Sequence, residues 1–212
     1  NQENPYQMGR IERDRMYNII KKWEWGNSES PDIYHDPETR KNSISFRGNL
    51  HRLANKFIDN GEFEKANEIM DLSFEKMPID FFEYYSLSEP YILSYYKIGE
   101  DKKAQNLYKT IEAKYLDQIK YYSISMREYE DMFDLSEFAE NIFTYTERYR
   151  GLIENQIKLG NYDLVKPSIK SFVDYTEIFK EIYGEYDYYM LLISFIEPLY
   201  LSSCLLYTSP SP

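Results

Sequence analysis

Carboxylates are the most abundant side chains in this chain that could do chemistry. An acidic run gathers four of them, Glu128, Glu130, Asp131 and Asp134. A pair of carboxyl groups can act as acid and as base or nucleophile in glycoside hydrolysis when the fold holds them at a set separation. Nothing in the spacing of this run specifies such a pair, and acidic helix faces are commonly just solvated. We therefore predict no catalytic residue here.

Other residue types used in catalysis and metal binding are scarce. The 212 residues include two histidines, His35 and His51, and one cysteine, Cys204. A lone cysteine forms neither an intramolecular disulfide nor a thiolate metal cluster. The sequence also lacks a Gly-rich phosphate loop, an HExxH motif and a Ser-centred elbow. It predicts no cofactor and no metal ion.

Composition and charge narrow the class of partner. The net charge of −11 disfavours nucleic acid and anionic membrane surfaces as partners. Tyrosine is unusually frequent, with 23 residues beside 12 phenylalanines. Its ring and polar tip suit half-buried helix seams, and a sugar-binding or peptide-binding platform is the alternative interpretation.

The elements that would position any site are predicted to be helices. A first helix is expected at about Arg10–Glu24, followed by a break at Gly26. Asp36 is a predicted N-cap, with Pro37 at the first helical position. The helix that starts there should run from Pro37 to Asn60 and end at Gly61, where a left-handed backbone suits glycine.

A repeat pattern surrounds Gly61. The tetratricopeptide unit has about 34 residues and joins two antiparallel helices by a Gly-containing turn. A second unit aligns on Gly99 and a weaker third on Gly160, with a long helical segment (115–132) and another helix (135–159) between them. The sequence thus predicts an all-α fold of tetratricopeptide-like helical hairpins, an α-solenoid, with flanking capping helices. The residues expected in its core are Leu53, Ala54, Phe57, Ala66, Met70, Tyr95, Ala104 and Tyr108.

The C-terminal part is apolar but interrupted. From Tyr188 to Pro212 the only charged residue is Glu197, and Glu197-Pro198 divides the stretch. A spanning helix needs about 20 predominantly apolar residues, so residues 188–201 are predicted to form a buried helix instead. The last nine residues, 204–212, resemble translated sequencing-adapter sequence and are expected to be a non-native tail.

These patterns divide the chain into three parts. Residues 1–46 carry the N-terminal helix and the Trp23-Glu24-Trp25-Gly26 string, whose rings we expect to pin a helix end onto the repeats. Residues 47–203 form the tetratricopeptide-like domain, and residues 204–212 the tail. If the first helices of the repeats line a concave groove, as in tetratricopeptide arrays, its binding residues are His51, Asn55, Asp59, Glu89, Tyr96, Lys97, Arg150 and Glu154.

The order of several segments resembles a known family. It begins with Lys22-Trp23-Glu24-Trp25-Gly26 and Ile33-Tyr34, and continues with Arg52-Leu53-Ala54, Gly61, Met77-Pro78 and Tyr95-Tyr96-Lys97-Ile98-Gly99. Over about residues 16–122 this is similar to the C-terminal region of the DUF2723 proteins of Bacteroidetes, classed as glycosyltransferase family 117.

That resemblance implies a membrane-embedded parent of GT-C type, which transfers a sugar from a lipid-phosphate carrier. The catalytic residues would lie in the membrane part, so none is carried over to this chain. The chain would then be an extracytoplasmic, periplasmic accessory domain that binds the acceptor protein or the parent's own membrane domain, without inserting into the membrane itself. The alternative is a free-standing tetratricopeptide scaffold for protein–protein interaction.

Overall fold

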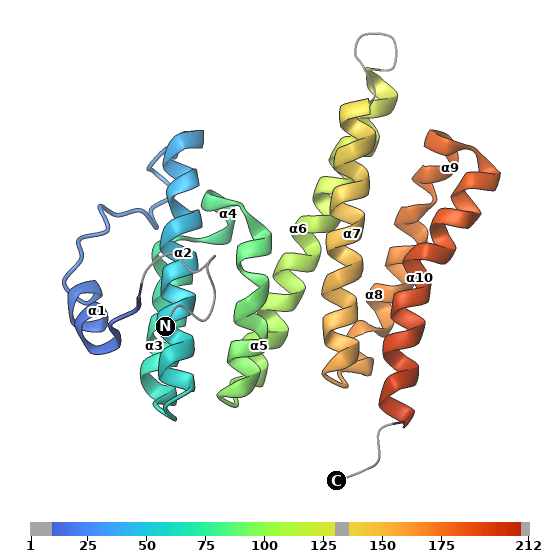
Figure 1. Cartoon of the computed structure of the whole chain (residues 1–212). Helices are drawn as coiled ribbons and strands as arrows, with labels where there is room; N and C mark the ends of the chain where they lie inside the picture. The colour runs from blue at the N-terminus through green and yellow to red at the C-terminus, as the bar shows by residue number, and fades with distance from the viewer. Residues whose placement is uncertain (1–9, 130–135, 209–212) are drawn as a thin grey trace. The chain divides into compact units, whose positions relative to one another are not determined.

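The computed structural model describes residues 10–129 and 136–208, and within them it contains helices and no strand (Figure 1). This confirms the prediction of an all-helical chain. The chain divides into two compact units, residues 1–107 and 108–212, which are described separately below.

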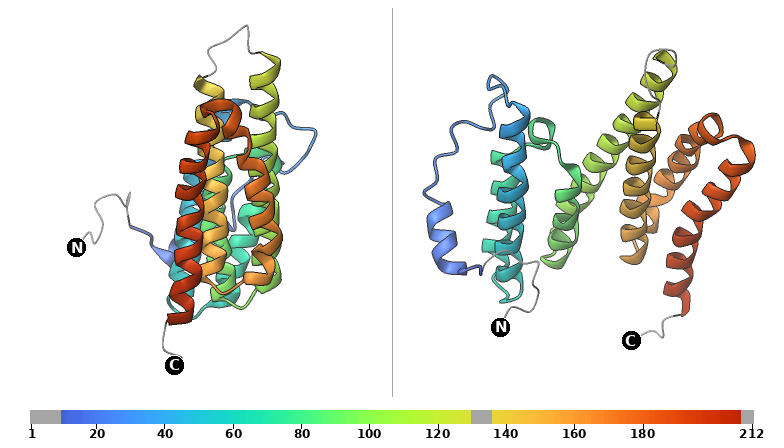
Figure 2. Two further views of the ribbon diagram at one scale, coloured as in Figure 1. Left: turned by 90° about the vertical axis from the view of Figure 1, so that its right-hand side faces the viewer. Right: turned by 45° about the horizontal axis from the view of Figure 1, so that its top comes forward.

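Unit 1 is built from α1 (Arg13–Ile20), α2 (Pro37–Ile58), α3 (Phe63–Lys76), α4 (Ile79–Phe82), the 3-10 turn η1 (Tyr85–Leu87), α5 (Glu89–Lys97) and the start of α6 (Asp101–Glu128). The α1 helix is shorter at both ends than the predicted Arg10–Glu24. It packs on α2, and the connection between them is a long loop beside α2 (Figure 2). The predicted start of α2 is confirmed, because the Asp36 carboxylate accepts from the backbone N–H groups of Glu38 (2.9 Å) and Thr39 (3.0 Å).

The three predicted turn glycines end their helices in the same way. Gly61, Gly99 and Gly160 have φ values of +74°, +80° and +79°, a region that favours glycine. At each, the glycine N–H bonds back three residues and the next N–H bonds back five, as in Glu62 to Phe57 (2.9 Å). These two hydrogen bonds form the Schellman motif, which provides donors for the last carbonyl groups of a helix.

Residues at equal distances from these glycines are buried alike. Eight, seven and four residues before each glycine, and five after it, every side chain is at most 3% exposed. The twelve residues are Leu53, Ala54, Phe57 and Ala66 around Gly61, Tyr91, Ile92, Tyr95 and Ala104 around Gly99, and Leu152, Ile153, Gln156 and Val165 around Gly160. All eight core residues predicted from the sequence are buried. Nine residues after the glycine, Met70 and Tyr108 are buried but Ile169 is 37% exposed, so the third repeat departs from the pattern on its second helix.

A buried arginine ties the helix ends of unit 1 together. Arg47 of α2 is fully buried, and it donates through Nη1 to Ser88 Oγ (2.8 Å) and through Nη2 to the carbonyl oxygen of Met77. Its guanidinium also lies over the Phe74 ring, 5.3 Å from the centroid. Met77 is the C-cap of α3, where a cation complements the helix dipole. Burial lowers the pKa of Arg47 to about 10, so the group remains charged at pH 7.

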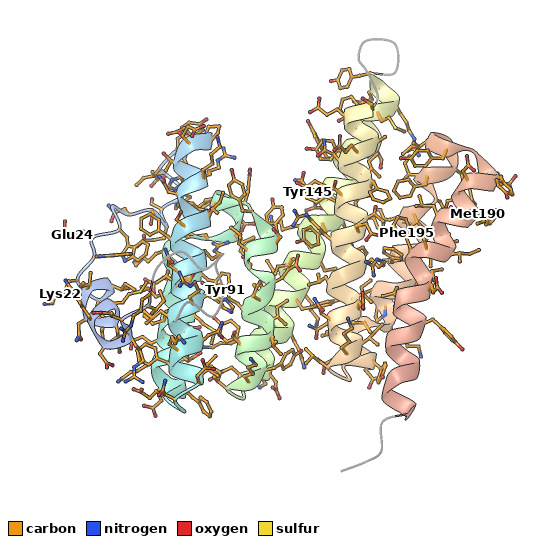
Figure 3. The ribbon with its side chains drawn as sticks, in the orientation of Figure 1. Lys22, Glu24, Tyr91, Tyr145, Met190 and Phe195 are labelled. Atoms are coloured by element: carbon orange, nitrogen blue, oxygen red, sulfur yellow. The ribbon has the colours of Figure 1, made fainter. Side chains whose placement is uncertain are left out.

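Unit 2 contains the rest of α6 together with α7 (Ser136–Lys158), α8 (Tyr162–Thr176), α9 (Ile178–Tyr183) and α10 (Glu185–Thr208). Aromatic rings form much of its core. Phe195 of α10 lies 5.7 Å from Phe179 and 5.8 Å from both Phe143 and Phe172, between ring centroids. Figure 3 shows Phe195 on the side of α10 that faces α7.

The C-terminal helical segments differ from the sequence predictions. The segment expected at 115–132 is not separate, because α6 runs unbroken from Asp101 to Glu128. The α10 helix is not buried as predicted: Phe195 is 1% exposed, whereas Met190 and Ile193 on another face are 57% and 59% exposed. The helix also continues to Thr208 instead of ending at Leu201 as predicted. The burial of its last side chains lies outside what the structure describes.

Candidate functional site

A hollow of about 690 Å³ in unit 1 is the candidate site. Its walls come from the loop after α1, from the N-terminal half of α2, and from Met77 and Phe82. Three rings form one cluster in it: the centroids of Trp23, Trp25 and Phe46 lie 5.4–6.1 Å apart, with interplanar angles of 61–80°. Volume and aromatic lining are typical of sites for small ligands.

A tight turn shapes the loop wall. Gly26 and Asn27 have φ values of +60° and +57°, and the Ser28 N–H bonds to the carbonyl oxygen of Trp25 (3.1 Å). Two successive left-handed residues are the mark of a type I′ turn, for which Gly and Asn are the preferred residues. The Ser28 hydroxyl then donates to the carbonyl oxygen of Lys76 (2.6 Å), which anchors the turn to the end of α3.

His35 supports the wall from the other side. Its Nε2 lies 3.0 Å from the carbonyl oxygen of Ser28, which requires the proton on this nitrogen, and its ring lies 4.5 Å from that of Phe82. The backbone carbonyl of His35 accepts from Arg40 Nε (2.8 Å). These bonds fix the loop relative to α2, so the hollow is formed before any ligand arrives.

The α2 wall follows from helical spacing. Thr39, Asn42, Ser43 and Phe46 recur at three- and four-residue steps and therefore share one face of the helix. The hydroxyls of Thr39 and Ser43 are engaged with Asp36 and with the Arg40 carbonyl. Asn42 is exposed, and its amide makes no hydrogen bond within the described part of the chain.

Several other polar groups at the hollow are likewise available to hydrogen-bond a ligand. Tyr34 is 79% exposed and Trp23 is 38% exposed. The Tyr34 hydroxyl, the Glu24 carboxylate and the two indole N–H groups make no hydrogen bond to other described residues. Figure 3 shows Glu24 on the loop that follows α1. The lining residues include this one carboxylate and no lysine or arginine.

The residues predicted for a groove lie elsewhere. His51 and Asn55 of α2 meet Ser94 of α5: His51 Nε2 lies 2.9 Å from Ser94 Oγ and 3.2 Å from Asn55 Nδ2. The His51 ring also packs on Tyr91, 4.7 Å between centroids. Burial is the main cause that lowers the pKa of His51, to about 4, and nearby Lys97 adds to it. This cluster joins two helices, and ligand binding by it stays a prediction.

The other predicted groove residues are divided between the units. In unit 1, Asp59 and Lys97 are exposed, while Glu89 and Tyr96 are half-buried. In unit 2, Arg150 Nη1 pairs with Glu154 Oε2 at 2.8 Å. The structure brings together His51 with Asn55 and Arg150 with Glu154. It does not assemble the eight residues into one described site.

The sequence predicted a packing role for the two tryptophans, and their rings do pack on Phe46. What it missed is that the same rings border a hollow with free polar groups. The Gly26-Asn27 pair is a turn signature that is visible in the sequence, but it does not show that the loop folds back onto α2 after the turn.

Three further observations bear on the site. Of the acidic run, Glu128 ends α6, and Glu130, Asp131 and Asp134 lie outside the described residues. Among the side chains that the structure describes, which do not include those of residues 198 and 201–208, no three His, Cys, Asp or Glu lie close enough together to bind a metal ion. Within the described residues, no helix combines the length and the apolar character needed to cross a bilayer.

Comparison with known proteins leaves the family open. No protein-family model, no curated protein and no solved structure matches the chain.

Proposed function

We propose that this chain is a tetratricopeptide-like helical-repeat module whose role is binding. The observation that supports the proposal is the likeness of the three helix–turn–helix segments around the turns of Gly61, Gly99 and Gly160. Each ends its first helix in the same Schellman motif, and each buries the same four positions. Repeats of this kind stack helix pairs and present extended surfaces to partners.

We further propose that the module is the extracytoplasmic accessory domain of a GT-C type membrane glycosyltransferase. The support is the order of segments from the Trp-Glu-Trp-Gly string to Gly99, which resembles the C-terminal region of DUF2723 proteins. In that setting the module would lie at the periplasmic face of the inner membrane, where it would hold an acceptor protein or contact the membrane domain of its own chain. A free-standing interaction scaffold is the second candidate, favoured by the same hairpins alone.

Gene context separates the two candidates. Sequencing the DNA upstream of the codon for Asn1 should reveal several hydrophobic segments of about 20 residues in the same reading frame. An upstream stop codon, or an upstream soluble domain, would contradict the glycosyltransferase proposal and leave the scaffold.

An activity assay tests the division of labour. The purified chain, incubated with lipid-phosphate sugars and candidate acceptor proteins, should transfer no sugar, because the resemblance places the catalytic carboxylates in a membrane region. The full reading frame should transfer sugar, and deletion of residues 37–200 should weaken acceptor use. Turnover by the isolated chain, or unchanged acceptor use after the deletion, would overturn the accessory role.

A further inference from the structure

The hollow beside Trp23 and Trp25 combines two properties that small-ligand sites share. Its walls are aromatic, with Trp23, Trp25 and Phe46 in mutual contact. Its rim carries polar groups without partners among the described residues, namely the Asn42 amide, the Glu24 carboxylate and the Tyr34 hydroxyl. A ligand that matches both the aromatic walls and the polar rim must have an apolar face and many hydrogen-bonding groups along its edge.

We propose that this hollow is a binding site for a neutral carbohydrate of about two sugar rings. A pyranose has a face of C–H groups that packs on an indole or phenyl ring, and hydroxyls around its edge. Amide and carboxylate side chains each accept or donate more than one hydrogen bond to such hydroxyls. The volume of about 690 Å³ lies within the range of small-ligand sites and accommodates a disaccharide.

Charge argues against other ligand classes. With no lysine or arginine in the lining, a phosphate or carboxylate ligand would find no cation to pair with. A quaternary ammonium can bind over aromatic faces, and Glu24 would favour it. That ligand, however, offers at most a single hydroxyl, as choline does, which is too few hydrogen-bonding groups to engage Asn42, Tyr34 and Glu24 together. The inference rests on the hollow alone and does not require the glycosyltransferase proposal.

The protein supplies its own reporter for this site. Trp23 and Trp25 are the only tryptophans of the 212 residues, so tryptophan fluorescence reads the hollow directly. The intact chain is titrated with cellobiose, maltose and N,N′-diacetylchitobiose, and separately with choline. At least one disaccharide should change the emission saturably, with a Kd on the order of 1 mM.

Two substitutions at exposed positions test the geometry with little risk to folding. Tyr34→Ala and Asn42→Ala should each raise the Kd about fivefold, the size of one lost hydrogen bond. Tyr186→Ala is the matched control, because Tyr186 of α10 is 79% exposed like Tyr34. Asn155→Ala, on an exposed site of α7, is the control for Asn42. Neither control should change the Kd, and circular dichroism should confirm that all four variants fold.

Three outcomes would overturn the proposal. The first is no saturable response to any of the disaccharides up to about 50 mM, a concentration well above the expected Kd. The second is binding that Tyr34→Ala and Asn42→Ala leave unchanged. The third is saturable binding of choline without binding of sugar, which would identify the hollow as an aromatic cage for cations.

Discussion

Both units expose aromatic and aliphatic side chains, but they arrange them differently. In unit 1, exposed rings from the loop after α1 and from α2 converge on one hollow. Unit 2 exposes apolar side chains on several helices, such as Tyr121 of α6, and five of them follow one face of α10. They are Tyr186, Tyr189, Met190, Ile193 and Tyr200, between 49% and 79% exposed. Exposure of apolar groups therefore does not define a ligand site by itself, and the proposed site lies where such groups converge from separate segments around free polar groups.

The polar interiors of the units differ as well. Unit 1 contains a buried charged group, Arg47, and a half-buried histidine, His51. The pKa of His51 is lowered far below that of an ordinary histidine. Among the described residues of unit 2, the buried polar side chains are uncharged, such as Thr146, Gln156 and Ser168. The charge of an ionisable group changes with pH, and a buried charge is costly when its hydrogen-bond partners are lost. We therefore expect the stability of unit 1 to depend more strongly on pH and on substitution of its buried polar groups than that of unit 2.

The largest effect should follow substitution of Arg47. Arg47→Ala removes the donors to Met77 and Ser88 and opens a cavity, so we expect a loss of about 3–5 kcal/mol in the free energy of unfolding, measured by chemical denaturation. Arg47→Met keeps most of the volume and should cost less. In unit 2, Tyr149→Phe removes only a neutral hydroxyl, which lies 2.8 Å from Glu112 Oε1, and should cost about 1 kcal/mol. Equal losses from Arg47→Ala and Tyr149→Phe would contradict the contrast between the units.

Leucines at matched positions test what the units share. Leu53 and Leu152 each lie eight residues before a turn glycine, and they are 0% and 1% exposed. Leu53→Ala and Leu152→Ala should each cost about 2–5 kcal/mol, because each truncation leaves a cavity. A loss below about 0.5 kcal/mol at either site, as is usual for surface positions, would show that the repeat register is wrong there.

The next effect is a pH dependence that belongs to unit 1. The pKa of His51 is lowered to about 4 in the folded chain, against 6.5 for an ordinary histidine. The unfolded chain therefore binds the proton more readily. The stability that His51 contributes is complete above pH 6.5 and is lost as the pH falls from 6.5 towards 4.

Allowing for partial exposure of the ring, this loss should be about 2 kcal/mol. Urea denaturation at several pH values checks it, with His51→Gln as the control that removes the titrating group. The variant should have a shallower slope of stability against pH over this window. The same slope in both proteins would show that His51 is not desolvated as described.

The repeat turns and the core could be predicted because both depend on local pattern. A glycine that ends a helix and apolar residues at fixed distances from it are visible in the sequence without knowledge of the partner helices. For this reason Gly61, Gly99 and Gly160 are found with the predicted backbone, and the eight expected core residues are buried.

The hollow and the buried arginine could not be predicted in the same way. Phe46 meets Trp23 and Trp25 only because a turn at Gly26 folds the loop back, and sequence spacing alone does not give that path. Arg47 is bonded to a backbone carbonyl, that of Met77, which has no signature in the sequence. Arginine is also usually exposed in proteins, so the residue type alone would predict an exposed side chain at position 47.

The exposed face of α10 should show the smallest effect. The stretch from Tyr188 onward is apolar on all sides, which is why burial was predicted, yet the unit has neighbours for only one of its faces. Ile193 is 59% exposed, whereas Phe195, two residues on, is 1% exposed. We therefore expect Ile193→Lys to change the free energy of unfolding by no more than about 0.5 kcal/mol, and Phe195→Ala to cost about 3–5 kcal/mol.

Thermal unfolding of both variants at two protein concentrations completes the measurement. If Ile193→Lys were strongly destabilising, and only at high concentration, the face would be covered by a second copy of the chain. A loss independent of concentration would instead mean that the face packs within the chain, and the contrast drawn between the two units would fail.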